Sequence, residues 1–443
     1  MNRPLMRRRR STTLLAAGAL VAAAVLTAPG AAQASTVKTE YAFKTFAYGT
    51  KAVAADGALL SGRTADTQIS CTRAAGVRSR NYVAEVNVPA DSPAFHATGV
   101  SSTSSTYQTR KGVIGNQSVN TIAELVLGTA DGPHISIDNL KTVSRAWADA
   151  KGKLHASSTV SSVDLVARTG NGQIDDLLNG GGINDLLDVI GANGGQYDIP
   201  GLGTLFLGAG TPLDADAHSA FARAKASVLR ADLDALGGSV TVGHTFARID
   251  RLPTGGLLGG SAQGLDAPEV LGGIVKVGRL GHKVLPCLGT HNQVKTNSPA
   301  GVVLDPAALG LGTIEGSVRG YIEKDGRALA RTTGRLASLT LGPIHVEGIV
   351  GQATARRSAG GRLTTSTQGS TIGSLTVNGT RRSVPDPGQS IEVPGVARLT
   401  FFLQEQGKRS VAVTALRVTL LSADTGPVGT VIDIGYAKAG IQR

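Results

Sequence analysis

Two stretches of this chain combine carboxylates with glycines and could bind a cation through oxygen ligands. Such oxygen-rich turns occur at Asp232-Leu233-Asp234 with Gly237-Gly238, and at Gly170-Asn171-Gly172 with Asp175-Asp176. Calcium prefers carboxylate and carbonyl oxygens as ligands. Neither stretch matches a complete calcium loop or repeats as one, and Asp, Asn and Gly are also the usual residues of tight turns. The sequence therefore predicts no cofactor, with calcium at these turns as the alternative.

One local cluster combines histidine with cysteine, because His282 and His291 flank Cys287. A zinc site would need further thiolate, imidazole or carboxylate ligands close by, and the cluster has none in sequence. We therefore predict no metal site and expect both histidines to lie in loops or at an interface.

No stretch of the chain matches a familiar catalytic motif. Gly260-Ser261-Ala262-Gln263-Gly264 lacks the spacing of a nucleophile elbow. A glycosidase needs two carboxylates at a set separation and usually aromatic platforms for the sugar. The best-matched carboxylates are Asp138 and Glu347, and the chain has one Trp, Trp147, and seven Tyr. The sequence therefore predicts a protein that is not an enzyme, with an extracellular hydrolase or a carbohydrate-binding module as alternatives.

Residues 1–34 have the three parts of a cleavable signal peptide. Arginines at positions 3 and 7–10 give a positive start, residues 14–28 are apolar, and Ala32-Gln33-Ala34 is a small-residue cleavage site. The apolar run is short for a membrane-spanning helix, and no other stretch is long enough. We therefore expect cleavage at Ala32 and Ala34. The mature chain is expected to be secreted, extracellular or loosely associated with the cell wall, without a membrane span.

The chain is basic, with 44 Lys and Arg against 32 Asp and Glu, a formal net charge of +12. Five of these arginines lie in the predicted signal peptide, so about +7 remains on the mature chain. That charge favours weak attraction to an anionic cell-wall polymer, and another surface protein is the alternative partner. Nucleic acid is not expected, because no basic helix or aromatic-interleaved basic patch is present.

The chain also resembles itself, in a set of matches that keep the same order. Gly62-Arg63 and Cys71 match Gly278-Arg279 and Cys287, at an offset of 216 positions. Further matches join Tyr107 with Tyr321, Leu125 with Leu339, Ile135 with Ile344, Pro200 with Pro394, Leu229 with Leu416, and Val242 with Ile434. Chance could give one or two such matches, but not an ordered series. We therefore predict a duplication, with a first copy over residues 35–252 and a second over residues 253–443.

Short alternating stretches and turn residues predict the fold within each copy. Residues 146–160 read as one hairpin around Lys151-Gly152, and residues 322–330 as another around a two-residue turn at Asp325-Gly326. Residues 214–236 are Ala-rich, but their match to a strand-like segment predicts strand. The fold class is therefore all-β, as two tandem antiparallel β-sandwich-like units. The first unit carries a Gly-rich insertion near residues 170–195, with short helices at 174–178 and 183–190.

Only two cysteines exist, Cys71 and Cys287, and they occupy matching positions in the two copies. In an exported protein a disulfide between them is the expected state, worth roughly 2–4 kcal/mol. Free buried thiols and bridges to other chains are the alternatives. Equivalent residues meet only near a local two-fold axis, so this bridge predicts copies packed side by side or face to face.

Several stretches resemble a known family. They are Tyr48-Gly49-Thr50, Ile69-Ser70-Cys71-Thr72, Pro286-Cys287-Leu288-Gly289-Thr290, Gly348-Ile349-Val350-Gly351, and residues 391–399. Together they are similar to the choice-of-anchor P family of secreted actinobacterial proteins. The resemblance implies an extracellular protein, but it brings no activity and no catalytic residue. We therefore predict a secreted or cell-surface β-protein with a structural or binding role in the cell envelope or extracellular matrix.

Overall fold

The computed structural model describes residues 36–54, 58–88, 94–129, 131–179, 182–207, 213–252, 256–267, 278–299, 301–302, 310–422 and 428–442. The predicted signal peptide, with Ala32 and Ala34, lies outside the described residues. From Thr36 onward the chain forms one compact unit.

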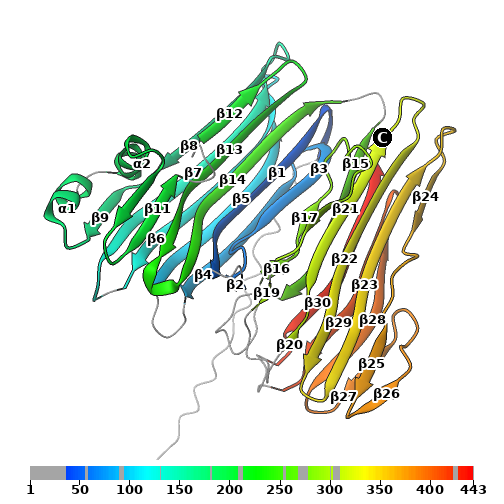
Figure 1. Ribbon diagram of the computed structural model, residues 1–443. Helices are drawn as coiled ribbons and strands as arrows, with labels where there is room; N and C mark the ends of the chain where they lie inside the picture. Colours follow the sequence, from blue (N-terminus) through cyan, green and yellow to red (C-terminus); the bar gives the residue numbers. More distant parts are fainter. Residues whose placement is uncertain are drawn as a thin grey trace, which may run out of the picture. The chain divides into compact units, whose positions relative to one another are not determined.

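Two sheets, antiparallel except for the short β2–β19 pair, make up the first half of this unit (Figure 1). Sheet 1 has the order β10-β11-β13-β14-β1-β2-β19, with β12 beside β13 and β3 beside β1. Sheet 2 has the order β4-β5-β6-β7-β8, with β9 beside β7. The strands are β1 (Val37–Ala54), β2 (Ala58–Ser61), β3 (Thr67–Ala75), β4 (Arg78–Val88), β5 (Phe95–Gln108), β6 (Ile114–Gly128), β7 (His134–Ala148), β8 (Leu154–Ser161), β9 (Asp164–Arg168), β10 (Gln196–Ile199), β11 (Gly203–Leu207), β12 (Leu213–Ala217), β13 (Phe221–Leu233) and β14 (Gly238–Arg251).

Two further sheets make up the second half, and one short strand of this half, β19, instead pairs with β2 of sheet 1. Sheet 3 has the order β16-β15-β30-β29-β28-β27, with β17 beside β15. Sheet 4 has the order β18-β21-β22-β23-β25-β26, with β20 beside β22 and β24 beside β23. The strands are β15 (Leu257–Ala267), β16 (Gly278–Leu280), β17 (Lys283–Val284), β18 (Lys295–Asn297), β19 (Gly301–Val302), β20 (Gly310–Leu311), β21 (Ile314–Ile322), β22 (Ala328–Leu341), β23 (Ile344–Arg357), β24 (Leu363–Ser366), β25 (Ser374–Val377), β26 (Thr380–Arg382), β27 (Ser390–Val393), β28 (Ala397–Gln406), β29 (Ser410–Leu420) and β30 (Val431–Gln442).

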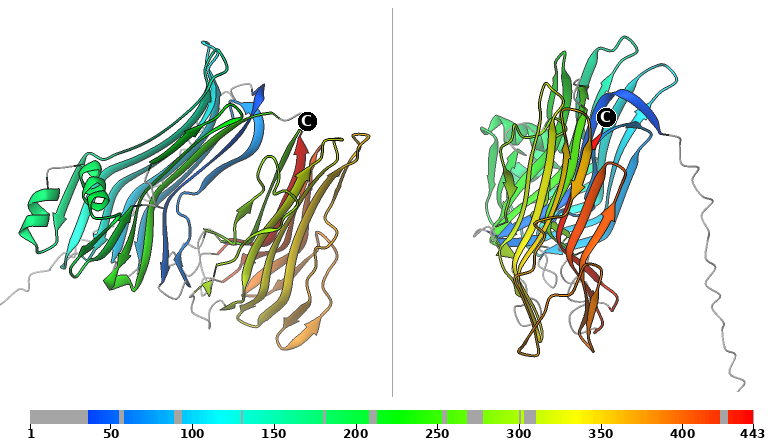
Figure 2. Two further views of the ribbon diagram at one scale, coloured as in Figure 1. Left: turned by 45° about the horizontal axis from the view of Figure 1, so that its top comes forward. Right: turned by 90° about the vertical axis from the view of Figure 1, so that its right-hand side faces the viewer.

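Each half is a two-layer sandwich, and the second half shows its two layers edge-on in Figure 2. Alternate residues of each strand point into the space between the layers and form separate hydrophobic clusters in the two halves. Leu, Ile, Val and Ala fill this space, and Phe43, Phe95 and Phe401 are its fully buried aromatic residues. At Gly351 a Cβ atom would lie 1.7 Å from the carbonyl oxygen of Gly435, so glycine lets β23 approach β30 closely. The predicted all-β class is confirmed.

The strand order of the first sandwich is repeated in the second. Sheet 1 contains β10-β11-β13-β14-β1, and sheet 3 contains β27-β28-β29-β30-β15 at the same places. Matched residues also take matched partners, since Leu229 lies opposite Val242 and Leu416 opposite Ile434. The glycines that follow, Gly243 and Gly435, have φ angles of 62° and 64°. This equivalence supports the predicted duplication.

The insertion near residues 170–195 carries two helices, α1 (Gly172–Leu178) and α2 (Ile183–Ala192), as predicted. Helix α2 buries Ile183, Leu186, Leu187 and Ile190, the spacing that puts apolar side chains on one helix face. The ambiguous residues 214–236 are mainly strand, in β12 and β13, and end in a short 3₁₀ turn at Asp234–Leu236.

Both predicted hairpins form, and the second has one loop residue more than the predicted two-residue turn. In the second hairpin the backbone N–H of Glu323 donates to the carbonyl of Arg327 at 2.8 Å, so the loop has three residues, and Gly326 has a φ of 87°. The first hairpin closes in the same way between Asp149 and Lys153, with Gly152 at a φ of 79°. A type I turn followed by a left-handed glycine explains this geometry, because the glycine forms a bulge that a two-residue turn lacks.

A disulfide joins Cys71 to Cys287, with their Cα atoms 5.2 Å apart. It is packed among Ala42, Leu252 and Leu257 at the junction of the two halves. The side-chain amide of Gln442 also donates to the carbonyl of Cys71 at 3.1 Å, so the last strand contacts β3 directly. The bridge joins the two predicted cysteines, and the local two-fold axis stays a prediction. Among the described residues, no helix is both long and apolar enough to span a membrane.

Candidate functional site

In the two turns considered for calcium, one carboxylate of each accepts hydrogen bonds from neighbouring groups of the protein. Asp175 accepts from the backbone N–H of Thr169 at 2.7 Å and from its hydroxyl at 2.8 Å. These hydrogen bonds lower the pKa of Asp175. Asp232 accepts two hydrogen bonds from Arg230, at 2.9 Å and 2.8 Å. Both carboxylates therefore serve local turn and strand structure.

The two histidines near Cys287 lie in different surroundings. His282 is buried, and burial followed by the charge of Arg279 lowers its pKa to about 3. Its Nδ1 atom has no hydrogen-bond partner among the described residues. His291 is exposed in a turn with a φ of 52°. Within the described ranges, no group of three or more His, Cys, Asp or Glu side chains is arranged to hold a metal ion.

The carboxylates considered for hydrolysis, Asp138 and Glu347, lie on different sheets and are both exposed. Glu347 accepts hydrogen bonds from the hydroxyl of Ser374 at 2.8 Å and from His345 at 3.2 Å. The Ser374 hydrogen bond, followed by that from His345, lowers the pKa of Glu347. A general acid needs the opposite shift, so this environment does not favour that role.

The only tryptophan belongs to a row of stacked side chains on the outer face of sheet 2. Trp147 stacks on His155, with ring centroids 5.3 Å apart. The guanidinium of Arg145 lies 4.9 Å from the Trp147 centroid and 5.2 Å from that of Tyr107. Arg145 therefore contacts both aromatic rings. We interpret this row as a cation–π ladder that stabilises the sheet, because its aromatic rings are already engaged by protein groups.

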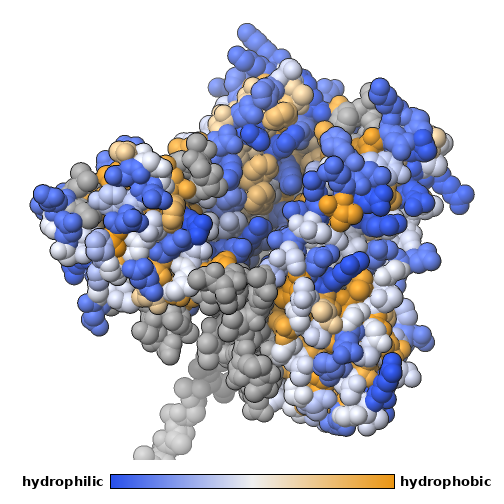
Figure 3. Space-filling model, in the orientation of Figure 1, coloured by the Kyte–Doolittle hydropathy of each residue, from blue (hydrophilic) through white to orange (hydrophobic). Residues whose placement is uncertain are grey.

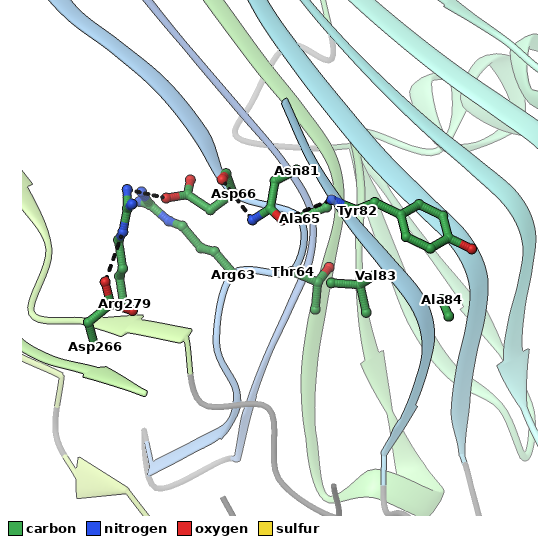
Figure 4. A pocket seen from close by; sticks show the side chains of 10 residues that line it. All are labelled: Arg63, Thr64, Ala65, Asp66, Asn81, Tyr82, Val83, Ala84, Asp266 and Arg279. Carbon is green, nitrogen blue, oxygen red and sulfur yellow. Dashed lines mark hydrogen bonds and ion pairs between the residues drawn. The ribbon is translucent and has the colours of Figure 1, made fainter. Parts of the chain in front are cut away.

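A more open candidate is the junction pocket, a cavity of ≈ 400 Å³ that residues of both halves line (Figure 4). Arg63, Asp66 and Asn81 come from the first half, and Asp266 and Arg279 come from the second. Arg63 and Arg279 are matched positions, and Figure 4 shows the ends of their side chains close together beside Asp66. Arg279 contacts Asp66 at 3.5 Å and Asp266 at 3.4 Å.

Some charged groups of the junction pocket are paired with an opposite charge, and one is not. The side chain of Asp66 is 8% exposed, and burial raises its pKa although Arg63 and Arg279 oppose that shift. The guanidinium of Arg63 lies over the ring of Tyr48 at 4.9 Å but forms no ion pair with a carboxylate of the described residues. Arg63 thus retains free hydrogen-bond donors.

The second candidate is a surface on the outer side of β21, β22, β23 and β24, here named the arginine face, around Arg319, Arg331 and Arg356. Arg319 lies directly opposite Arg331 across the β21–β22 pair. Arg356 lies on the neighbouring strand, opposite Leu329 in the adjacent cross-strand row. In the part of the chain that the structure describes, none of the three arginines forms an ion pair with a carboxylate.

Two cavities on the arginine face, of ≈ 530 Å³ and ≈ 400 Å³, share Arg331 and Arg356 and therefore adjoin each other. Their other lining residues are mostly polar: His291, Asn292, Arg319, Tyr321, Glu323, Gln352, Thr354, Thr364, Thr365, Ser366 and Gln368. Asn292 accepts from Arg319 at 2.8 Å, whereas the buried Nε atom of Arg331 has no partner among the described residues. Figure 3 shows mainly hydrophilic residues over the upper part of the second half, where these strands lie.

Comparison with family models, with curated proteins and with solved structures found no match to this chain. The resemblance to the choice-of-anchor P family therefore stays a prediction.

Sequence reasoning missed the arginine face because the arginines look scattered along the chain. The feature that reveals the pair is the loop length of the hairpin between β21 and β22. With the predicted two-residue turn, Arg319 would face Thr332, whereas the three-residue loop places it opposite Arg331. A shift of one residue in register was enough to hide the pair.

Proposed function

We propose that this protein is an extracellular binding protein without a catalytic role, and that it holds an anionic cell-wall polymer on its arginine face. The observation that carries the proposal is the direct cross-strand pair of Arg319 and Arg331. Like charges placed opposite each other destabilise a sheet. A pair that costs stability and lacks a protein counter-ion is best explained by an external anion.

The residues around the pair suit such a ligand. Guanidinium groups bind carboxylate and phosphate oxygens with two parallel hydrogen bonds. Threonine, serine and glutamine side chains beside them can bind further oxygens of a sugar–phosphate or uronic acid chain. Because the two cavities adjoin, an extended polymer could contact both at once. A linear polyanion therefore fits better than a small anion.

The matched face of the first half lacks the directly opposed arginine pair, although Arg78 and Arg145 lie at either side of the matched positions in the same cross-strand row. Ser105 and Gln117 occupy the places of Arg319 and Arg331, opposite each other in the β5–β6 pair. The opposed arginine pair that carries the proposal is therefore specific to the second half. If the halves arose by duplication, the two faces have diverged.

Location outside the cell is part of the same proposal. It is supported by the signal-peptide pattern of residues 1–34, by the disulfide and by the resemblance to secreted proteins.

The test is a binding titration of the purified chain against four polymers: poly(glycerol phosphate), a polyuronate, double-stranded DNA and neutral dextran. The triple variant Arg319→Gln, Arg331→Gln, Arg356→Gln removes the arginine face. The control variant Arg78→Gln, Arg80→Gln, Arg382→Gln removes the same charge from exposed positions elsewhere.

We expect the triple variant to bind one of the wall-like polyanions about 100-fold more weakly at low salt, from about 1 kcal/mol for each arginine. The control should lose no more than about threefold, and dextran should not bind the arginine face. Equal losses in the two variants would show non-specific attraction. Tighter binding to DNA than to both wall-like polymers would make nucleic acid the partner and the proposal wrong.

A further inference from the structure

We infer that the junction pocket is a second binding site, for a neutral saccharide unit. The site is separate from the arginine face and does not depend on it. It combines charged and polar groups of both halves in one cavity of a size typical of small-ligand pockets.

The charge of the pocket favours a neutral ligand. Two guanidinium groups, Arg63 and Arg279, lie beside two carboxylates, Asp66 and Asp266, so the four charges cancel. An added anion would meet the two carboxylates, and an added cation would meet the two arginines. A neutral ligand avoids both penalties.

Hydrogen-bonding capacity in the pocket favours hydroxyl groups. Each sugar hydroxyl both donates and accepts, and so matches a surface where donors and acceptors alternate. Arg63 offers donors that no described carboxylate uses. The only side-chain hydrogen bond of the Asp66 carboxylate in the described structure is the long 3.5 Å contact to Arg279, which leaves acceptor capacity.

A small apolar wall completes the site. Ala65, Val83 and Ala84 line the same cavity, and the C–H face of a sugar ring can pack against such a surface. The ring of Tyr82 points away from the arginines in Figure 4, so no stacking on it is required.

The disulfide holds the two walls of this pocket together. Arg63 and Asp66 shortly precede Cys71, and Arg279 precedes Cys287 by the same spacing as Arg63 precedes Cys71. The pocket needs residues from both halves, so sugar binding should depend on the bridge.

The experiment is saturation-transfer NMR and calorimetry of the full mature chain with neutral gluco-, manno-, galacto- and arabino-oligosaccharides and N-acetylglucosamine oligomers. The variants are Arg63→Gln and Asp66→Asn, each checked for folding by its thermal melt, and the control is Asp386→Asn at an exposed loop position. We expect at least one saccharide to bind, each pocket variant to weaken it at least tenfold, and the control to leave it unchanged. The triple arginine variant of the other site should bind it as the parent does.

Absence of binding by every saccharide in the panel would overturn the inference. So would binding that both folded pocket variants retain, because the ligand would then lie elsewhere. Competition by inorganic phosphate at equal affinity would identify an anion site instead.

Discussion

Replacing Arg331 by Gln should weaken polymer binding while leaving the fold as stable as before or more stable. The change installs the residue that the first half has at the matched place, Gln117. In both halves the residue has paired strands on both sides, so glutamine is already compatible with this backbone position.

The expected stability change follows from the pair with Arg319. Removing a directly opposed like charge should raise the free energy of unfolding by about 0.2–1 kcal/mol at low salt. The Nε–H of Arg331, buried without a partner in the described structure, is removed at the same time. The gain should shrink towards 0.15 M salt, where the Debye length falls to about 8 Å.

Polymer binding, in contrast to stability, should become weaker in Arg331→Gln. Loss of one guanidinium contact worth about 1 to 1.4 kcal/mol should weaken the polyanion about five- to tenfold. Urea unfolding at low and physiological salt measures the first quantity, and titration with the polymer measures the second. Arg80→Gln is the matched control, since it removes one exposed charge from β4 and should change neither quantity appreciably.

The reasoning would be refuted if Arg331→Gln lost more than about 1 kcal/mol of stability with unchanged binding. Arg331 would then be a structural residue whose stem packs on the sheet. A gain in stability with unchanged binding would also contradict the proposed polymer site, because the Arg319–Arg331 pair would then destabilise the fold without binding a ligand.

Two further measurements test the junction of the halves. The double variant Cys71→Ser, Cys287→Ser opens a covalent loop with a sequence separation of 216. The chain-entropy model predicts that the free energy of unfolding, measured in urea, falls by up to about 5 kcal/mol. A loss below about 1 kcal/mol would contradict this prediction. Burial lowers the pKa of His244 and His282 to about 3, so on acidification the unfolded chain binds protons at these histidines before the folded chain does. The free energy of unfolding should therefore fall as the pH drops from about 6.5 towards 3, by at most about 1.4 kcal/mol per pH unit for each histidine. The variant His244→Gln, His282→Gln should lose this dependence in thermal melts between pH 7.5 and 4.5, and an unchanged slope would count against the assignment.

Sequence patterns predicted much of the fold because its signals are local. Alternating apolar residues mark strands, and glycines such as Gly152 and Gly326 mark the turns, where a left-handed backbone favours them. The apolar spacing of residues 183–190 predicted α2 for the same reason. The disulfide followed from composition, since a chain predicted to be exported and holding only Cys71 and Cys287 has one possible internal pair.

The candidate sites were harder to predict, because carboxylates were judged by their neighbours in sequence. Asp175 and Asp232 look available until Thr169 and Arg230 are seen to donate to them. Trp147 looks like one isolated aromatic residue until strand pairing places it beside Tyr107 and His155. Whether a polar group is free or satisfied depends on contacts across strands, which a linear pattern does not contain.

Local sequence patterns were enough to predict the strand-rich class, the two similar halves and the bridge between them, because these depend on periodicity and on only two cysteines. Which charges meet depends on how the strands pair and pack. A single extra loop residue set the register that opposes Arg319 to Arg331. The packing of the halves brought Asp66 to Arg279, which lies 213 positions away. Register and packing depend on cooperative long-range contacts, and those contacts decide which polar groups are left free.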